Sequence, residues 1–205
     1  MWSTLAARHL PTAGAVPRFV DAEGTEQDWL VHRWRGEVSP AERRLLAGLV
    51  GPVLDIGCGP GRVAAHLARR GIDALGVDVA EAAVMAARRR GATALCASVF
   101  DRLPAEGRWA GAVLLDGNLG IGGDPLRLLR RLHGLLRAGG RVLAEADAPG
   151  AATRSTRVRL HGSGSTWQPW ALVCIDDVGQ LAARAGFRLT ATEASEGRWF
   201  AQLDV

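Results

Sequence analysis

The chain of 205 residues contains no lysine and no tyrosine, so all 25 of its basic residues are arginines. Without lysine the protein cannot use Schiff-base or P-loop chemistry, and the missing tyrosine removes a phenolic acid or base. Only three cysteines occur, at Cys58, Cys96 and Cys174. Their odd number and wide spacing favour neither a disulfide framework nor a Cys-x-x-Cys metal pair. We therefore expect no metal site.

Long apolar runs are also missing, because a polar residue interrupts each one well before the roughly 18 residues of a membrane span. The first twenty residues lack the layout of a signal peptide, so we expect a cytoplasmic protein with no membrane partner. The net charge of +4 would suit a nucleic acid, but the arginines are scattered among the expected helices. Solvated helix faces explain that pattern, and no nucleic-acid partner is expected.

Short apolar segments alternate with helical ones through the middle of the chain, which is typical of a parallel sheet wound by helices on both faces. We expect strands over residues 53–56, 74–77, 93–97, 111–115, 141–145, 187–192 and 199–203. The last two flank the turn Ser195-Glu-Gly197 and predict a hairpin that closes one sheet edge antiparallel. Helices are expected within 28–49, over 62–70, over 80–90, after Asp124-Pro125, and after Asp176 and Asp177.

The most informative stretch is Val53-Leu-Asp-Ile-Gly-Cys-Gly-Pro-Gly61. A strand that contains Asp55 passes into a glycine turn, which leads directly into a helix. Gly57, Gly59 and Gly61 permit unusual backbone angles and close approach of a ligand. Asp78 falls at the end of the next strand, where a carboxylate can accept hydrogen bonds from ribose hydroxyls. The G-x-G-x-G spacing departs from the dinucleotide fingerprint, and Asp55 would repel a pyrophosphate.

With these motifs the chain resembles the class I S-adenosylmethionine-dependent methyltransferases. Asp55–Gly61 is similar to their first motif, and Gly76-Val-Asp78 is similar to their ribose-binding motif. The stretches Ser98–Pro104 and Leu132–Val142 resemble the third-strand segment and the helix-then-strand element of the family. The resemblance covers roughly residues 40–147. It implies an α/β fold with a doubly wound, mostly parallel, Rossmann-like sheet of seven strands whose last strand is antiparallel, with helices on both faces.

The resemblance also implies S-adenosyl-L-methionine as cofactor and S-adenosyl-L-homocysteine as product. The turn from Gly57 through Cys58 and Gly59 to Gly61 would lie under the methionine and ribose. Asp55 would place the ammonium group or order the glycine turn, and Asp78 would bind the ribose. Val79 would contact one adenine face. The other expected cofactor-binding residues are Trp34, Ser98, Val99, Phe100 and Asp116. Ser98 stands where the family often carries an acidic residue, which leaves the adenine contact there open.

The acceptor side is expected after the fourth strand, at Leu115-Asp116-Gly-Asn118-Leu-Gly-Ile-Gly-Gly-Asp124. Asp116 and Asn118 are candidate catalytic residues, and the glycines would permit close approach of a ligand; a long turn capped by Asp124 is the alternative. His161 is the candidate general base, beside Trp167 and Trp170. His32 and His133 are weaker candidates.

We expect residues 1–38 to form an N-terminal extension with a lid helix. Residues 39–205 would form the cofactor-binding domain, with a substrate-side insertion near 148–172 that contains a possible strand at 157–161. The predicted function is methyl transfer by in-line displacement to an O, N or C nucleophile of a small molecule, by a monomer or homodimer. The alternatives are a non-catalytic S-adenosylmethionine-binding module and a nicotinamide-dependent oxidoreductase.

Overall fold

The computed structural model describes residues 19–27, 31–160 and 166–205. Its main feature is a seven-stranded sheet in the order β10-β11-β7-β6-β3-β4-β5. The strands are β3 (Val53–Ile56), β4 (Ala74–Asp78), β5 (Thr93–Cys96), β6 (Trp109–Leu114), β7 (Leu136–Ala146), β10 (Arg188–Ser195) and β11 (Arg198–Asp204). Strands β3 to β7 pair in parallel, whereas β11 is antiparallel to both of its neighbours. The predicted fold class is confirmed.

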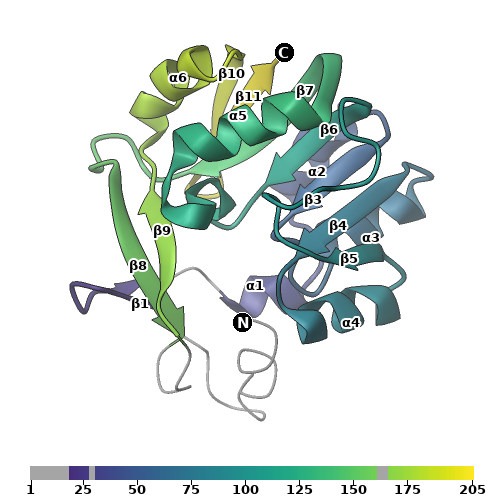
Figure 1. Ribbon diagram of the computed structural model, residues 1–205, viewed down its shortest axis with the longest axis horizontal. Coiled ribbons are helices and arrows are strands. Elements are labelled where there is room, and N and C mark those ends of the chain that lie inside the picture. Colours follow the sequence, from purple (N-terminus) through teal and green to yellow (C-terminus); the bar gives the residue numbers. More distant parts are fainter. Residues whose placement is uncertain (1–18, 28–30, 161–165) are drawn as a thin grey trace.

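Helices cover both faces of this sheet (Figure 1). Helices α5 (Pro125–Leu135) and α6 (Ile175–Arg184) pack on one face, where their leucines and Val178 join the larger core. Helices α2 (Pro40–Ala47) and α3 (Arg62–Arg69) pack on the other face. Helix α4 (Glu81–Arg89) packs beside α3 through alanines and Val84.

Strand β3 shows how the sequence divides between the two faces. Leu54 and Ile56 point into the core under α5 and α6, whereas Val53 joins the core under α2 and α3. Because side chains alternate along a strand, Asp55 shares the face of Val53 and points toward α3. This alternation determines which helix the buried carboxylate can reach.

Several helix boundaries follow from capping residues. Ser39 and Glu42 form a capping box at the start of α2. At the start of α5, the N-cap Asp124 accepts a hydrogen bond from the backbone N–H of Arg127. The helices expected within 28–49 are α1 (Val31–Arg35) and α2, which residues 36–39 separate. One boundary prediction was wrong. Helix α6 begins after the N-cap Cys174, whose sulfur accepts from the N–H of Asp176, so the acidic pair lies inside the first turn.

A second, four-stranded sheet has the order β2-β1-β8-β9 and was not predicted as such. It consists of β1 (Phe19–Asp21), β2 (Glu26–Gln27), β8 (Arg154–Leu160) and β9 (Gln168–Leu172). Residues 157–160 of the expected strand form the second half of β8, and residue 161 lies outside the described residues. Asp21, fully buried, pairs with Arg154 at 3.0 Å and so joins the start of the described chain to the insertion. This sheet stands beside the carboxyl edge of the main sheet (Figure 1).

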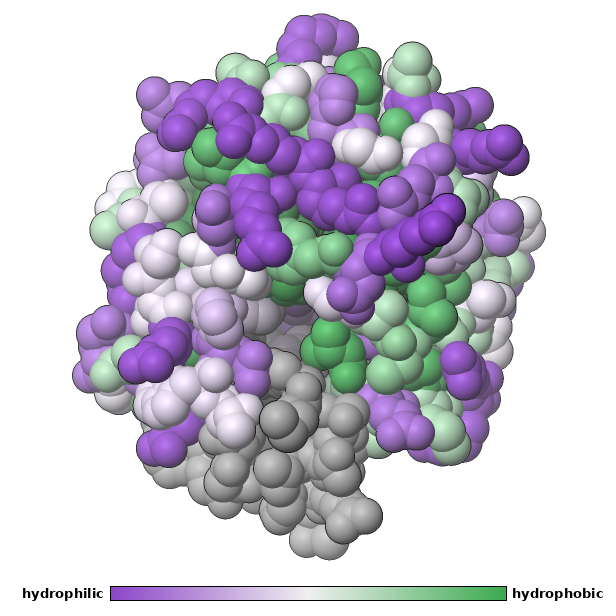
Figure 2. Space-filling view, viewed as in Figure 1, coloured by the Kyte–Doolittle hydropathy of each residue, from purple (hydrophilic) through white to green (hydrophobic). Residues whose placement is uncertain are grey.

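Hydrophilic side chains cover the outer surface in the region of α5 (Figure 2), a helix that contains the arginines Arg127, Arg130 and Arg131. Exposed basic groups on a helix face are expected to be solvated. Among the residues that the structure describes, no helix combines the length and the apolar character needed to cross a membrane.

Candidate functional site

The glycine turn after β3 is held close to the neighbouring strand. The backbone N–H groups of Gly57 and Cys58 both donate to the carbonyl oxygen of Val77, at 2.8 and 3.1 Å. Gly57, Gly59 and Gly61 all have positive φ angles, between +51° and +79°. Only glycine adopts this region without strain, so the chain reverses here as its sequence predicts.

The three glycines differ in what surrounds them. A Cβ at Gly57 would lie 2.7 Å from Asn118 Nδ2, and one at Gly61 would lie 2.5 Å from the Cβ of Ala87 in α4. A Cβ at Gly59 would meet no described atom within 4 Å. Gly57 and Gly61 are therefore required by packing within the protein, whereas Gly59 leaves open space over the turn.

Asp55 orders the start of α3. Its side chain is 4% exposed, and Oδ2 accepts a hydrogen bond of 3.0 Å from the backbone N–H of Ala64. The N-cap residue of α3 is Gly61, which has no side chain to serve that role, so Asp55 satisfies an N–H group that the helix leaves free. Burial raises the pKa of Asp55 to about 7, against this hydrogen bond and the charge of Arg62.

Asp78 joins the end of β4 to the glycine turn. Its Oδ2 accepts from the N–H of Gly59 at 2.9 Å, and its Oδ1 accepts from the N–H of Ala80 at 2.8 Å. Each carboxylate oxygen has two lone pairs, so both can accept a further hydrogen bond. Burial raises the pKa of Asp78. The adjacent Val79 is exposed.

The segment after β5 contributes unequally. Val99 is only 4% exposed and packs in the larger core, so its side chain offers little surface to a ligand. Phe100 is half-buried, with the guanidinium carbon of Arg127 4.2 Å from the centre of its ring. The hydroxyl of Ser98 accepts from the N–H of Phe100 at 3.2 Å and shapes this turn.

Asn118 supports the glycine turn from the opposite side. Its Nδ2 donates to the carbonyl oxygens of Ile56 and Gly57, at 2.9 and 3.0 Å. The glycines that follow it were expected to admit a ligand, and here the structure differs. A Cβ at Gly120 would lie 2.0 Å from the carbonyl oxygen of Ala171, and one at Gly122 would lie 2.7 Å from Phe100. These glycines, in the 3₁₀ segment η1 (Asn118–Gly123), let β9 and Phe100 pack closely.

Three other predicted residues lie near or beyond the limits of the described chain. Trp34 in α1 is half-buried, and its carbonyl oxygen accepts from Arg90 at 3.5 Å, which ties α1 to the end of α4. His161 lies outside the described residues, and so does the side chain of His32.

A buried cluster of charges, not predicted from the sequence, surrounds Asp116. Arg62 contacts Glu42, and donates to Asp116 Oδ2 at 2.7 Å. Arg198 contacts Glu42 at 2.6 Å, Glu145 at 2.5 Å and Asp116 at 3.3 Å. We call these five residues the charge cluster. It contains three carboxylates and two guanidinium groups, and its members come from α2, α3, β7, β11 and the turn after β6.

The charge cluster changes the acidity of its members in opposite directions. Although burial alone would raise it, the pKa of Glu42 is lowered to about 2 by hydrogen bonds and charge from Arg62 and by Arg198. Burial raises the pKa of Asp116, with Arg62 opposing the effect and Glu145 adding to it. Both Asp116 oxygens face guanidinium groups, so this side chain anchors the turn after β6.

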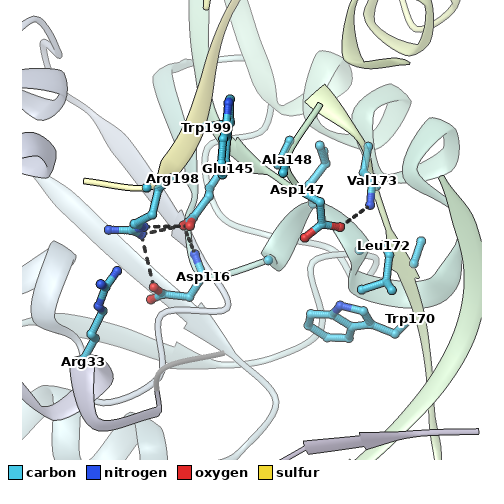
Figure 3. Close-up of a pocket in the computed structure, with 16 residues that line it drawn as sticks. Arg33, Asp116, Glu145, Asp147, Ala148, Trp170, Leu172, Val173, Arg198 and Trp199 are labelled. Carbon is cyan, nitrogen blue, oxygen red and sulfur yellow. Dashed lines mark hydrogen bonds and ion pairs between the residues drawn. The ribbon is translucent and has the colours of Figure 1, made fainter. Parts of the chain in front are cut away.

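A cavity of about 200 Å³ opens beside the charge cluster. Its charged lining residues are Arg33, Asp116, Glu145, Asp147 and Arg198, and the indoles of Trp170 and Trp199 add aromatic surface (Figure 3). Asp147 was also missed by sequence reasoning, although its place just past the end of β7 marks it as a carboxyl-edge residue. Its Oδ2 accepts from the N–H of Val173 at 3.0 Å.

Comparisons with known proteins point to one family. Residues 53–140 match the family model described as "Methyltransferase domain". No curated protein sequence matches the chain.

Solved structures share the fold. A methyltransferase from Bacteroides fragilis, solved with S-adenosyl-L-homocysteine, is 22% identical over 94% of this chain and 89% of that chain, with a TM-score of 0.77. The Burkholderia thailandensis 1,6-didemethyltoxoflavin-N1-methyltransferase is 22% identical over 83% and 80%, with a TM-score of 0.64. A glycopeptide N-methyltransferase is 16% identical over 80% and 89%, with a TM-score of 0.62.

Proposed function

We propose that the chain is a class I S-adenosylmethionine-dependent methyltransferase, which binds S-adenosyl-L-methionine at the carboxyl edge of its sheet and methylates a small molecule. The match of residues 53–140 to the methyltransferase-domain model and the shared fold support this proposal. The observation that carries this proposal is the open space over Gly59, next to the carboxylate of Asp78. The backbone N–H of Gly59 donates a hydrogen bond to that carboxylate. A nucleoside needs both a backbone free of side chains and an acceptor for its ribose hydroxyls. The structural neighbours solved with S-adenosylmethionine or its product support this cofactor.

The residues present fit such a cofactor. The Asp78 oxygens retain lone pairs for two hydroxyl groups, and Val79 and Phe100 offer apolar surface for a purine on either side of the carboxyl edge. Cys58 packs against Gly76, so its role is to fill the turn. Ser98 and Trp34 complete the proposed set. Asp55 and Asn118 act as positioning residues that hold the turn from below and from the side.

The cofactor, when bound, supplies a methyl group already activated by a sulfonium centre. The protein must then align the acceptor and exclude water. The cavity beside Asp116 is the proposed acceptor site, and its volume lies below the roughly 300–1,000 Å³ of ordinary ligand pockets, which supports a small acceptor. Arg33 lines this cavity from α1, which supports a lid role for the N-terminal segment. Asp116 and His161 stay candidates for the acceptor side.

Calorimetry with S-adenosyl-L-homocysteine tests the cofactor site. Asp78→Ala should weaken binding by about 1–3 kcal/mol, because a charge-assisted acceptor is lost. The matched control is Asp73→Ala, which removes an exposed carboxylate on the opposite edge of the sheet. Equal affinity of both variants would exclude Asp78 from the site. A methylation assay that detects released S-adenosyl-L-homocysteine then tests turnover, and tight binding of NADH instead would contradict the proposal.

A further inference from the structure

The cavity beside the charge cluster carries information about the acceptor. Resting on the function proposed above, we infer that the methyl acceptor is a small amine and that the carboxylate of Asp147 binds its protonated nitrogen. Three features of the cavity support this inference: its charge balance, the unused hydrogen-bond acceptor capacity of Asp147, and the apolar and aromatic side chains of the remaining wall.

The charges in and behind the cavity wall favour a cation. The charge cluster and the two further charged lining residues, Arg33 and Asp147, provide four carboxylates against three guanidinium groups among the described residues. A cavity with this balance repels an anionic acceptor and attracts a positively charged one. The excess negative charge is concentrated at one of the lining carboxylates, as the hydrogen bonds of each carboxylate indicate.

Two of the three carboxylates that line the cavity are already paired. Glu145 receives two hydrogen bonds from Arg198, at 2.5 and 2.7 Å, and one from the N–H of Asp116 at 2.6 Å. Asp116 lies between Arg62 and Arg198. The negative charge of each of these two carboxylates is therefore already balanced by a guanidinium group.

Asp147 has a different environment. The structure gives its carboxylate one hydrogen bond, from the N–H of Val173 to Oδ2, and Figure 3 shows the group beside the open middle of the cavity rather than at Arg198. A carboxylate can accept about four hydrogen bonds, so most of its capacity is unused in that contact. Its backbone is fixed as well, because Asp147 N–H donates to Val173 and Asp147 C=O accepts from Ile175.

The rest of the wall suits the apolar body of an amine. Trp170 and Trp199 line the cavity together with Leu119 and Leu172. Indole faces attract ammonium groups as well as apolar carbon, so they are compatible with a cationic acceptor. The volume of about 200 Å³ favours a compact body, so probes with one ring suit this cavity.

An ammonium group has no lone pair, so it must lose one proton before it reacts. Asp147 accepts that proton from the nitrogen, and burial raises the pKa of Asp147, which favours proton uptake. The nitrogen lone pair then forms the bond to the methyl carbon while the carbon–sulfur bond breaks. The electron pair of that bond stays on sulfur, and the products are an N-methylated ammonium ion and a neutral thioether.

Binding of matched probes tests the inference without requiring the natural acceptor. The protein saturated with S-adenosyl-L-homocysteine is titrated with benzylamine, benzyl alcohol and benzoate, which share a ring and differ in charge. Wild type should bind benzylamine at least about tenfold more tightly than benzyl alcohol, as expected for a charged hydrogen bond. Asp147→Asn keeps an acceptor for Val173 and should abolish the preference, whereas Asp73→Asn should retain it. Thermal unfolding checks that both variants are folded.

The outcomes separate the two proposals. Failure of S-adenosyl-L-homocysteine to bind would overturn the proposed function and this inference with it. If the product binds but benzylamine shows no advantage over benzyl alcohol, or benzoate binds best, only the amine inference is wrong. A benzylamine preference that survives in Asp147→Asn also overturns it. An Asp147→Asn variant that loses instead its preference for S-adenosylmethionine over S-adenosyl-L-homocysteine would assign Asp147 to the cofactor.

Discussion

At the scale of single residues, the turn after β3 places three glycines in similar backbone conformations but in different surroundings. Gly61 contacts α4, Gly57 contacts Asn118, and Gly59 faces open space. A substitution at each position therefore carries the same kind of backbone strain, but only one of them projects a new side chain into the proposed cofactor site. Comparing variants at Gly61 and Gly59 therefore separates a loss of stability from a loss of cofactor binding.

Gly61→Ala should destabilise the protein more than Gly59→Ala does. Both variants place alanine at a positive φ, but the new methyl group at Gly61 also overlaps Ala87, and such overpacking costs about 1–3 kcal/mol. Gly59→Ala should instead weaken binding of S-adenosyl-L-homocysteine at least about tenfold, or ~1.4 kcal/mol. Urea unfolding and calorimetry measure the two effects. A Gly59→Ala variant that binds normally would show that the cofactor does not approach this residue.

At the scale of secondary-structure elements, the charge cluster links α2 and α3 on one face of the sheet to β7 and β11. Removing one partner of a buried ion pair leaves the other charge uncompensated, so Glu42→Gln should lower the free energy of unfolding by about 3–5 kcal/mol. Glu193→Gln is the control, since its pair with Arg44 is 61% and 42% exposed and should be worth less than about 1 kcal/mol. Equal losses for the two variants would contradict the importance of the cluster.

The strands of the main sheet could be predicted because each is a short apolar run between turns. The second sheet could not, since β1 and β2 have only three and two residues and the first half of β8, Arg-Ser-Thr, carries no apolar pattern. Only the second half of β8 was expected as a strand. Strand β7 was expected from Arg141 but begins at Leu136, because that residue already pairs with Trp109 of β6. Local patterns indicate an element, whereas its ends depend on the neighbouring strand.

In the candidate site, the residues close together in the sequence could be predicted, whereas the long-range contacts could not. Asp55, the glycines and Asp78 lie within one βαβ unit, so their spacing in the sequence already implied proximity. The structure adds the contacts of Asp55 and Asp78 with backbone N–H groups. The charge cluster and Asp147 depend on contacts such as Arg198 with Glu42, which are 156 residues apart. No pattern within a short window of sequence reports such a contact.

At the scale of the whole molecule, stability should depend on pH through its buried carboxylates. Burial raises the pKa of Asp55 from 3.8 to about 7, so between these values the folded state holds more protons than the unfolded chain. Stability from this residue is complete below about pH 4 and is lost as the pH rises through 7. Glu42 acts oppositely: its lowered pKa gives stability that is lost as the pH falls below 4.5 toward 2.

The free energy of unfolding should therefore fall between pH 5 and pH 8, and Asp55→Asn should reduce that fall by roughly 2–3 kcal/mol. Asparagine keeps an acceptor for Ala64 but does not titrate. Urea unfolding at constant ionic strength measures both proteins, with Asp73→Asn expected to follow the wild type. Parallel profiles for wild type and Asp55→Asn would show that Asp55 keeps an ordinary acidity.

The wall of the cavity formed by Trp170 and Leu172 belongs to the β8–β9 hairpin, whereas the cradle around Gly59 and Asp78 is encoded a hundred residues earlier. In the proposed assignment, the donor and acceptor sites thus draw largely on separate stretches of the chain. Under that assignment, substitutions in the β8–β9 hairpin would change the choice of acceptor and leave the residues proposed to bind the methyl donor unchanged. Replacing the β8–β9 hairpin is accordingly a way to engineer the choice of acceptor.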